Sequence, residues 1–187
     1  MRALRILTAV ALATILSGCW VLSIEPLYTS DDLVFEPSLV GVWAGIDGDE
    51  DESWTFLPLD SSSYRLVTTE SGAPDAVFEA HLLRLGGHLY LDLLPEEPEE
   101  MNEFQLGHLI PAHSFWTVSL QGNVLVLDVM DTERLKRVID STGADIGHLE
   151  RDHAIVLTAT TGELQTFVTD FMGEMISGDP LTLERAH

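Results

Sequence analysis

Polar side chains that could move protons alternate with leucines on both sides of the Gly86-Gly87 pair; they are His81, His88, Tyr90 and Asp92. Alternate residues of a strand face the same side of a sheet, and a glycine pair favours a tight turn that places two strands side by side. The pattern therefore predicts one polar sheet face. Such a face could carry out proton transfer or line a cavity, and it could equally be the solvated outer face of a half-buried sheet, which we favour.

The motifs that identify common enzymes and metal sites do not occur in the sequence. No Gly-x-Ser-x-Gly elbow, phosphate-binding loop or dinucleotide fingerprint is present, and no histidine pair has the spacing of the zinc-protease helix. The run Asp47–Glu52 alternates acidic residues as a calcium loop does, but Glu52 replaces the required glycine and Pro58 the bidentate glutamate. We interpret this run as a solvated hairpin tip, with a looser calcium site as the alternative. We predict no catalytic residue, metal or cofactor, and a hydrolase is kept as a remote alternative.

Charge limits the partners of this chain. Among its 187 residues, 31 are acidic and nine are lysine or arginine, which gives a formal net charge of −22. Nucleic acids and anionic lipid surfaces would repel such a chain, whereas a basic protein would attract it. Two acidic stretches, Asp47–Glu52 and Glu96–Glu103, are the candidate contacts for a basic partner. Cys19 is the only cysteine, so the chain has no internal disulfide and no cysteine-based zinc site.

The first twenty residues have the organisation of an export signal. Arg2 and Arg5 precede an apolar run, Ile6–Ile15, that is too short to span a bilayer. Small residues follow the run where a signal peptidase would cut. The pattern predicts that the chain leaves the cytoplasm.

Leu16-Ser17-Gly18-Cys19 resembles the lipobox of bacterial lipoproteins. The resemblance implies cleavage between Gly18 and Cys19, lipid attachment to the Cys19 thiol, and a stable membrane anchor of two or three acyl chains. Trp20, rather than aspartate, follows the cysteine, and this favours the outer membrane by analogy with enterobacterial lipoproteins. Removal of residues 1–18 would leave seven basic and 31 acidic residues, a formal net charge of −24.

The rest of the chain reads mainly as short strands separated by glycine, proline and acidic turns. We expect strands at residues 39–46, 53–59, 63–70, 76–85, 88–94, 112–120, 124–130, 154–159 and 180–185. A helix is an alternative for 76–85. Two helices are expected in the C-terminal half, one capped by Asp131 and one opened by the capping box of Thr160 and Glu163.

Gly41-Val42-Trp43 resembles the Gly-x-Trp signature of lipocalins and related calycins. The resemblance implies an antiparallel barrel with Trp43 at its closed base, while a buried tryptophan on an ordinary first strand is the alternative. The fold class we predict is mainly β: an antiparallel meander curled or closed into a lipocalin-like barrel, with the two helices in its C-terminal half.

We divide the chain into a signal peptide (1–18), a lipidated tether and N-terminal wrap (19–37) and one β-rich domain (38–187).

Three functions are compatible with these features. The first hypothesis is an envelope module that binds a small apolar ligand through Trp43, Trp54 and Trp116. The alternative is an envelope interaction or assembly protein that uses its acidic loops on a basic partner. A hydrolase that uses the polar face around His88 and Asp92 is the remote third.

Overall fold

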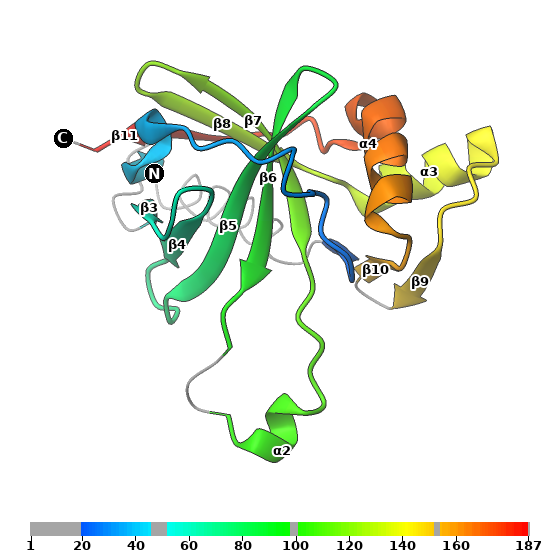
Figure 1. Cartoon of the computed structure of the whole chain (residues 1–187), viewed down its shortest axis with the longest axis horizontal. Coiled ribbons are helices and arrows are strands. Elements are labelled where there is room, and N and C mark those ends of the chain that lie inside the picture. Colours follow the sequence, from blue (N-terminus) through cyan, green and yellow to red (C-terminus); the bar gives the residue numbers. More distant parts are fainter. Residues whose placement is uncertain (1–19, 46–51, 98–100, 152–153, 187) are drawn as a thin grey trace, which may run out of the picture.

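The computed structural model describes residues 20–45, 52–97, 101–151 and 154–186, and a closed antiparallel β-barrel dominates it (Figure 1). The strands follow one another around the barrel in the order β11-β2-β3-β4-β5-β6-β7-β8. Their bounds are β2 Gly41–Gly45, β3 Ser53–Pro58, β4 Tyr64–Thr69, β5 Ala76–Leu85, β6 His88–Pro95, β7 Ser114–Gln121, β8 Val124–Val129 and β11 Leu181–Arg185. The predicted meander is confirmed, and it is closed.

Local sequence explains how the barrel turns and closes. Gly86 and Gly87 both have positive φ, which lets β5 turn directly into β6. At the seam, the last strand pairs with both β8 and β2, with Arg185 opposite Trp43. The barrel therefore has no free sheet edge between its first and last strands.

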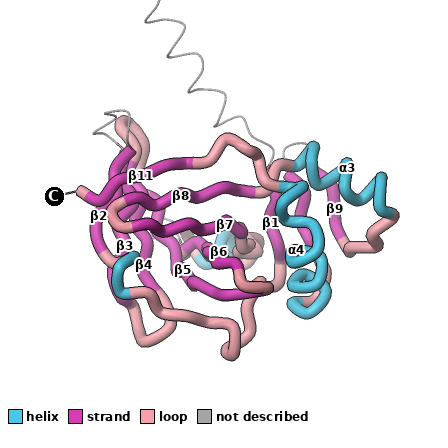
Figure 2. The backbone as a smooth tube through the Cα atoms, turned by 90° about the horizontal axis from the view of Figure 1, so that it is seen from above, coloured by secondary structure: helices cyan, strands magenta, loops and turns pink. Residues whose placement is uncertain are grey.

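A smaller layer lies beside the barrel (Figure 2). It contains a three-stranded sheet in the order β1-β10-β9 and two helices. The bounds are β1 Trp20–Ser23, β9 His148–Arg151, β10 Ala154–Leu157, α3 Thr132–Thr142 and α4 Thr161–Met175. Strand β1 pairs in parallel with β10, so the start of the described chain lies against a strand from its C-terminal half.

Both helices begin where their sequences predict, and α3 also ends where expected. The Asp131 side chain accepts a hydrogen bond from the Arg134 backbone N–H (2.8 Å), and Gly143 ends α3 in the left-handed region. Thr160 and Glu163 form the predicted capping box at the start of α4. Apolar residues of α4 then face the outside of the barrel, so this helix covers the sheet and does not plug it.

The domain has two hydrophobic cores, one on each side of the barrel wall. The inner core fills the barrel and includes Trp43, Trp54, Phe56 and Tyr64. The outer core lies between the barrel and the smaller layer and includes residues of α3, α4 and the N-terminal segment, residues 20–37. Because residues alternate along β5 and β6, these strands contribute to both cores.

Four short elements differ from the sequence expectations. Strands β1 and β9, the 3-10 helix η1 (Pro37–Leu39) and the one-turn helix α2 (Glu103–Leu106) were not expected from composition. The first barrel strand begins at Gly41, and not at Leu39, because η1 occupies the preceding residues. Residues 76–85 form a strand and not a helix, since they pair with β4 on one side and with β6 on the other.

Candidate functional site

The three tryptophans proposed as ligand contacts all belong to the inner core. Trp43 lies opposite Trp54 across β2 and β3, and the Trp54 and Trp116 rings meet edge to face with centroids 5.5 Å apart. The Trp43 indole N–H donates to the Leu39 backbone carbonyl (2.8 Å), which holds η1 against the barrel end. The structure thus brings the three residues together on one side of the barrel wall.

The interior around these tryptophans is filled by side chains. Phe56, Tyr64 and a set of leucines from several strands are completely buried there. The Arg185 guanidinium lies over the Trp43 ring, 4.4 Å from its centroid, and donates to the Val40 carbonyl (2.8 Å). Two hollows lie on the outer surface of the described residues, one at α2 and one beside α4. An apolar ligand would therefore have to displace packed side chains to enter the barrel.

The predicted polar face exists, but most of it is buried. His81 lies opposite Asp92 in the register of β5 and β6. Both side chains point to the outside of the barrel, as the alternation predicts. The N-terminal segment covers them, and Asp92 is only 1% exposed. The expected solvated face is therefore wrong for His81, Tyr90 and Asp92, because a segment remote in sequence packs on it. It is correct for His88, which is exposed beside the Gly86-Gly87 turn.

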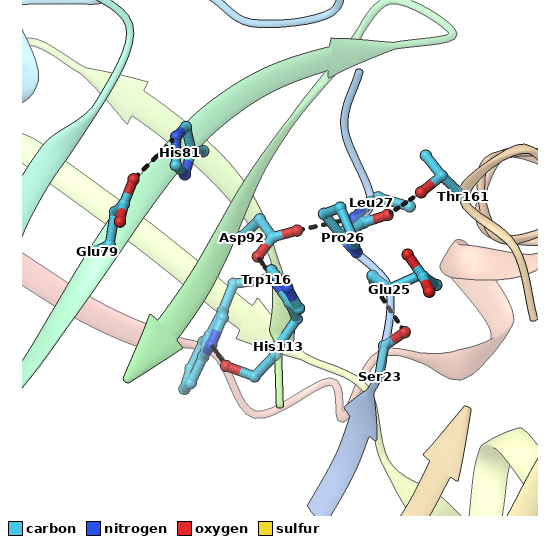
Figure 3. Close-up of polar contacts among 11 residues, drawn as sticks. Ser23, Glu25, Pro26, Leu27, Glu79, His81, Asp92, His113, Trp116 and Thr161 are labelled. Atoms are coloured by element: carbon cyan, nitrogen blue, oxygen red, sulfur yellow. Dashed lines mark hydrogen bonds and ion pairs between the residues drawn. The ribbon is translucent and has the colours of Figure 1, made fainter. Parts of the chain in front are cut away.

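Asp92 is the centre of a buried polar network (Figure 3). One carboxylate oxygen is 2.6 Å from His113 Nδ1, and the other accepts the Leu27 backbone N–H at 2.8 Å. Since an ionised carboxylate only accepts, His113 Nδ1 carries the proton of this bond. His113 also exchanges backbone hydrogen bonds with Ser23 (2.9 and 2.8 Å). Asp92 thus ties β6, the residue just before β7 and the N-terminal segment together.

His81 lies in a separate contact on the same face. Its ring stacks on Tyr28 with centroids 4.2 Å apart, and its Nε2 is 3.5 Å from a Glu79 carboxylate oxygen. Burial lowers the pKa of His81, although Glu79 and Asp92 act in the opposite direction. Burial, with Asp92 and Glu79 nearby, raises the pKa of Tyr28 to about 12. Both side chains are therefore uncharged near neutral pH.

Chemically, this face is suited to holding the fold together. Asp92 and His113 form a hydrogen-bonded pair of the kind that assists a nucleophile, but His113 is only 7% exposed. The nearby Ser23 hydroxyl is fully buried and donates to the Glu25 carbonyl (2.8 Å). A substrate would reach this pair only after the N-terminal segment had moved. His88 does not join the network.

The most exposed apolar residues of the described chain lie between β6 and β7. We call residues 96–113 the arm; the structure describes all of it except residues 98–100. The arm projects from the barrel and carries α2 at its far end (Figure 1). Phe104 is 78% and Ile110 73% exposed, and Met101 and Leu109 are also exposed. Large apolar side chains gathered on a projection are typical of an interaction site.

Local contacts give the arm a defined shape. Asn102 and Gln105 form a capping box on α2, and the Phe104 ring packs on His108 with centroids 4.6 Å apart. Next to them lies an apolar hollow of about 300 Å³, lined by Met101, Phe104, Gln105, His108 and Leu109. At the base of the arm, Glu96 accepts two hydrogen bonds from the Arg65 guanidinium (2.8 and 3.1 Å). The hollow therefore stands at the end of a braced projection.

Several predicted sites lie outside the described residues. They include Gly18 and Cys19 of the lipobox and Asp47–Asp51 of the first acidic run. Within the described ranges, no three potential metal ligands are grouped closely enough to hold an ion. The helices of those same ranges are all too short or too polar to cross a bilayer.

Sequence reasoning missed His113 and the apolar part of the arm. His113 follows Asp92 by 21 residues, and only the β6–β7 pairing brings the two together. The arm did carry a signal, because Met101, Phe104, Leu109 and Ile110 interrupt a polar, proline-containing loop. Apolar residues in such a loop indicate a surface that packs against another one. Here these residues are exposed, so the described part of the domain does not cover them.

Comparisons of this chain with protein-family models, with curated proteins and with solved structures found no match.

Proposed function

We propose that this protein is a lipid-anchored interaction protein of the bacterial cell envelope, and that its arm docks onto a basic protein partner. The observation that carries the proposal is the exposure of Phe104, on α2, and of Ile110, between α2 and β7, in the braced arm. Burial of a phenylalanine or isoleucine side chain contributes about 1.5–3 kcal/mol, so these two residues offer substantial binding free energy to a partner. Apolar anchors of this kind dominate many protein interfaces.

The charge around the arm indicates the character of the partner. Glu103 is exposed on α2 beside Phe104, and Glu96 and Glu97 are exposed where the arm leaves β6. Residues 99 and 100 of the sequence are also glutamates. A partner with an apolar pocket rimmed by lysine and arginine would match both features. The net charge of −24 proposed for the mature chain would speed encounter with such a partner, since long-range attraction raises association rates.

The anchor supports a role at the membrane. The lipobox ends at Cys19, and β1 begins with the next residue, Trp20. Strand β1 is hydrogen-bonded to the base of the arm through Ser23 and His113. In this proposal the lipid attachment and the arm are therefore held by one rigid connection. The outer membrane is the proposed location, because Trp20 is not the acidic residue that retains enterobacterial lipoproteins in the inner membrane.

In-cell photo-crosslinking tests the docking role. A photoreactive residue at position 104 should capture a basic protein, and the yield should fall when Glu97 and Glu103 are replaced by glutamine. Glu96 is left unchanged, because it braces the arm through Arg65. The matched control is position 59, because Leu59 is exposed on the β3–β4 turn of the barrel. Equal capture from positions 59 and 104 would refute the proposal. So would a crosslinking yield that stays the same when the glutamates are replaced.

The anchor needs its own test. Cys19→Ser should release the protein from the membrane fraction while leaving its fold unchanged, because the cysteine lies before the first described strand. If the variant stays membrane-bound, the lipoprotein assignment is wrong, whatever the crosslinking shows.

Binding of a small apolar ligand in the barrel is the second candidate. The closed barrel and the inward-facing Trp54 and Trp116 favour it, whereas the filled interior ranks it behind the arm. Native mass spectrometry of the gently purified protein should then show an apolar mass that Trp116→Ala reduces. An unliganded mass would count against it.

A further inference from the structure

A second hollow, of about 350 Å³, lies on the helical side of the domain, between the end of α3 and the first turns of α4. This side is well separated from the arm (Figure 1). Three side chains supply apolar surface and three carboxylates line the same hollow; they are Ile146, Phe167 and Phe171, and Asp145, Glu163 and Asp170. The volume is at the lower end of the range of small-ligand sites, about 300–1,000 Å³, and is suited to a single long side chain.

The apolar surface is aromatic. The Phe167 and Phe171 rings lie next to each other on α4, with centroids 5.3 Å apart and an interplanar angle of 53°. Phe167 is buried in the outer core, whereas Phe171 is only half-buried and lies at the hollow. Aromatic faces attract ammonium and guanidinium groups, and they also pack well on the methylene stems of these side chains.

Charge in the hollow has a single sign. None of the described residues that line it is basic. Glu163 already accepts hydrogen bonds from the Thr160 backbone N–H and hydroxyl (2.9 and 2.8 Å). The amino end of α4 also disfavours a cation, because helix dipoles place positive charge there. Asp170, more than two turns into the helix, is therefore the better position for a cationic group.

We propose that this hollow binds an arginine or lysine side chain presented by a polypeptide. The apolar stem of that side chain packs on Phe171, and its charged end lies near Asp170 and Asp145. Charge complementarity selects this occupant, because the hollow combines aromatic surface with carboxylates and has no basic residue of its own. The inference goes beyond the proposed function, since it concerns a different face from the arm and does not need the arm to be correct.

Peptide binding to the full-length protein, purified in a zwitterionic detergent, tests the inference. The probe is a dye-labelled acetyl-Leu-Arg-Leu-Arg amide, followed by fluorescence anisotropy in about 0.15 M salt, where charges farther apart than the Debye length are largely screened. The same peptide with glutamine in place of arginine is the matched control. The arginine peptide should bind at least tenfold more tightly than the control.

Variants separate the hollow from general attraction to an acidic protein. Asp170→Asn should weaken binding of the arginine peptide about threefold, in line with exposed ion pairs, and Asp145→Asn should act in the same direction. Asp75→Asn removes the same charge from an exposed turn outside the hollow and should leave the affinity unchanged. Phe171→Leu keeps apolar volume but removes the ring, and it should weaken the arginine peptide more than the glutamine peptide.

Three results would overturn the inference. One is equal weakening by Asp75→Asn and Asp170→Asn, which would show diffuse charge attraction only. Another is equal affinity for the arginine and glutamine peptides. The third is binding of free butylguanidinium as tight as that of the peptide, which would assign the hollow to a small organic cation. None of these results depends on the crosslinking from position 104, so the arm and the hollow can fail separately.

Discussion

Replacement of Asp92 by alanine should strongly destabilise the fold. The carboxylate is buried and accepts hydrogen bonds from His113 Nδ1 (2.6 Å) and from the Leu27 N–H (2.8 Å). A hydrogen bond to a charged group contributes about 1.5–3 kcal/mol, and a buried donor left without a partner adds a desolvation cost. We therefore expect Asp92→Ala to lower the free energy of unfolding by about 3–5 kcal/mol, a large part of the 5–15 kcal/mol typical of a domain.

Urea denaturation at neutral pH measures this loss, and the melting temperature should fall by roughly 10 °C for a domain of this size. Asp92→Asn should cost less, about 1–2 kcal/mol, because its carbonyl oxygen can still accept from Leu27. Asp75→Ala, on an exposed turn, is the matched control and should change stability by less than about 0.5 kcal/mol.

A double-mutant cycle with His113→Ala identifies the cause. If the two side chains stabilise each other, the second substitution should cost much less once the first has been made. An Asp92→Ala loss below about 1 kcal/mol, or strict additivity with His113→Ala, would refute the view that this network holds the N-terminal segment to the barrel.

Three further predictions follow from other contacts. Gly41→Ala should destabilise the fold by about 1–3 kcal/mol in the same denaturation assay, because φ is +141° and a Cβ would overlap the Arg185 guanidinium; no loss would contradict this. Burial lowers the pKa of His81, so the unfolded chain binds a proton more readily than the folded chain. The free energy of unfolding should therefore fall as the pH drops below about 6.5. Melting curves recorded at several pH values should show a weaker pH dependence of stability for His81→Gln. Phe104→Ser with Ile110→Ser should leave stability within about 0.5 kcal/mol of the parent while abolishing crosslinking from residue 109.

The sequence predicted the barrel well because its strands have local signals. Alternation of apolar and polar residues marks β5 and β6, and the Gly86-Gly87 pair and the acidic runs separate strands. The capping residues of α3 and α4 act within one helical turn, so they too could be read directly. Each of these features depends on residues that are neighbours in the chain.

What the sequence could not predict depends on contacts between distant segments. The composition of residues 20–37 indicates that this segment is partly apolar. It does not indicate that the Leu27 N–H donates a hydrogen bond to Asp92, 65 residues later. The same contact buries a face that alternation alone predicts to be solvated on a half-buried sheet. Similarly, β1 could not be identified from four residues, because its pairing partner β10 lies more than 130 residues away.

The most direct test of the docking arm is hydrogen exchange in the native envelope. Amide exchange would be compared between protein in isolated membranes and the same protein purified in detergent, with residues 101–110 compared against the exposed β3–β4 turn. The proposed function predicts that the partner slows amide exchange in residues 101–110 in membranes but not in detergent. Replacing Glu97 and Glu103 by glutamine should remove this protection. Equal exchange of the arm in both preparations would contradict a partner-binding arm.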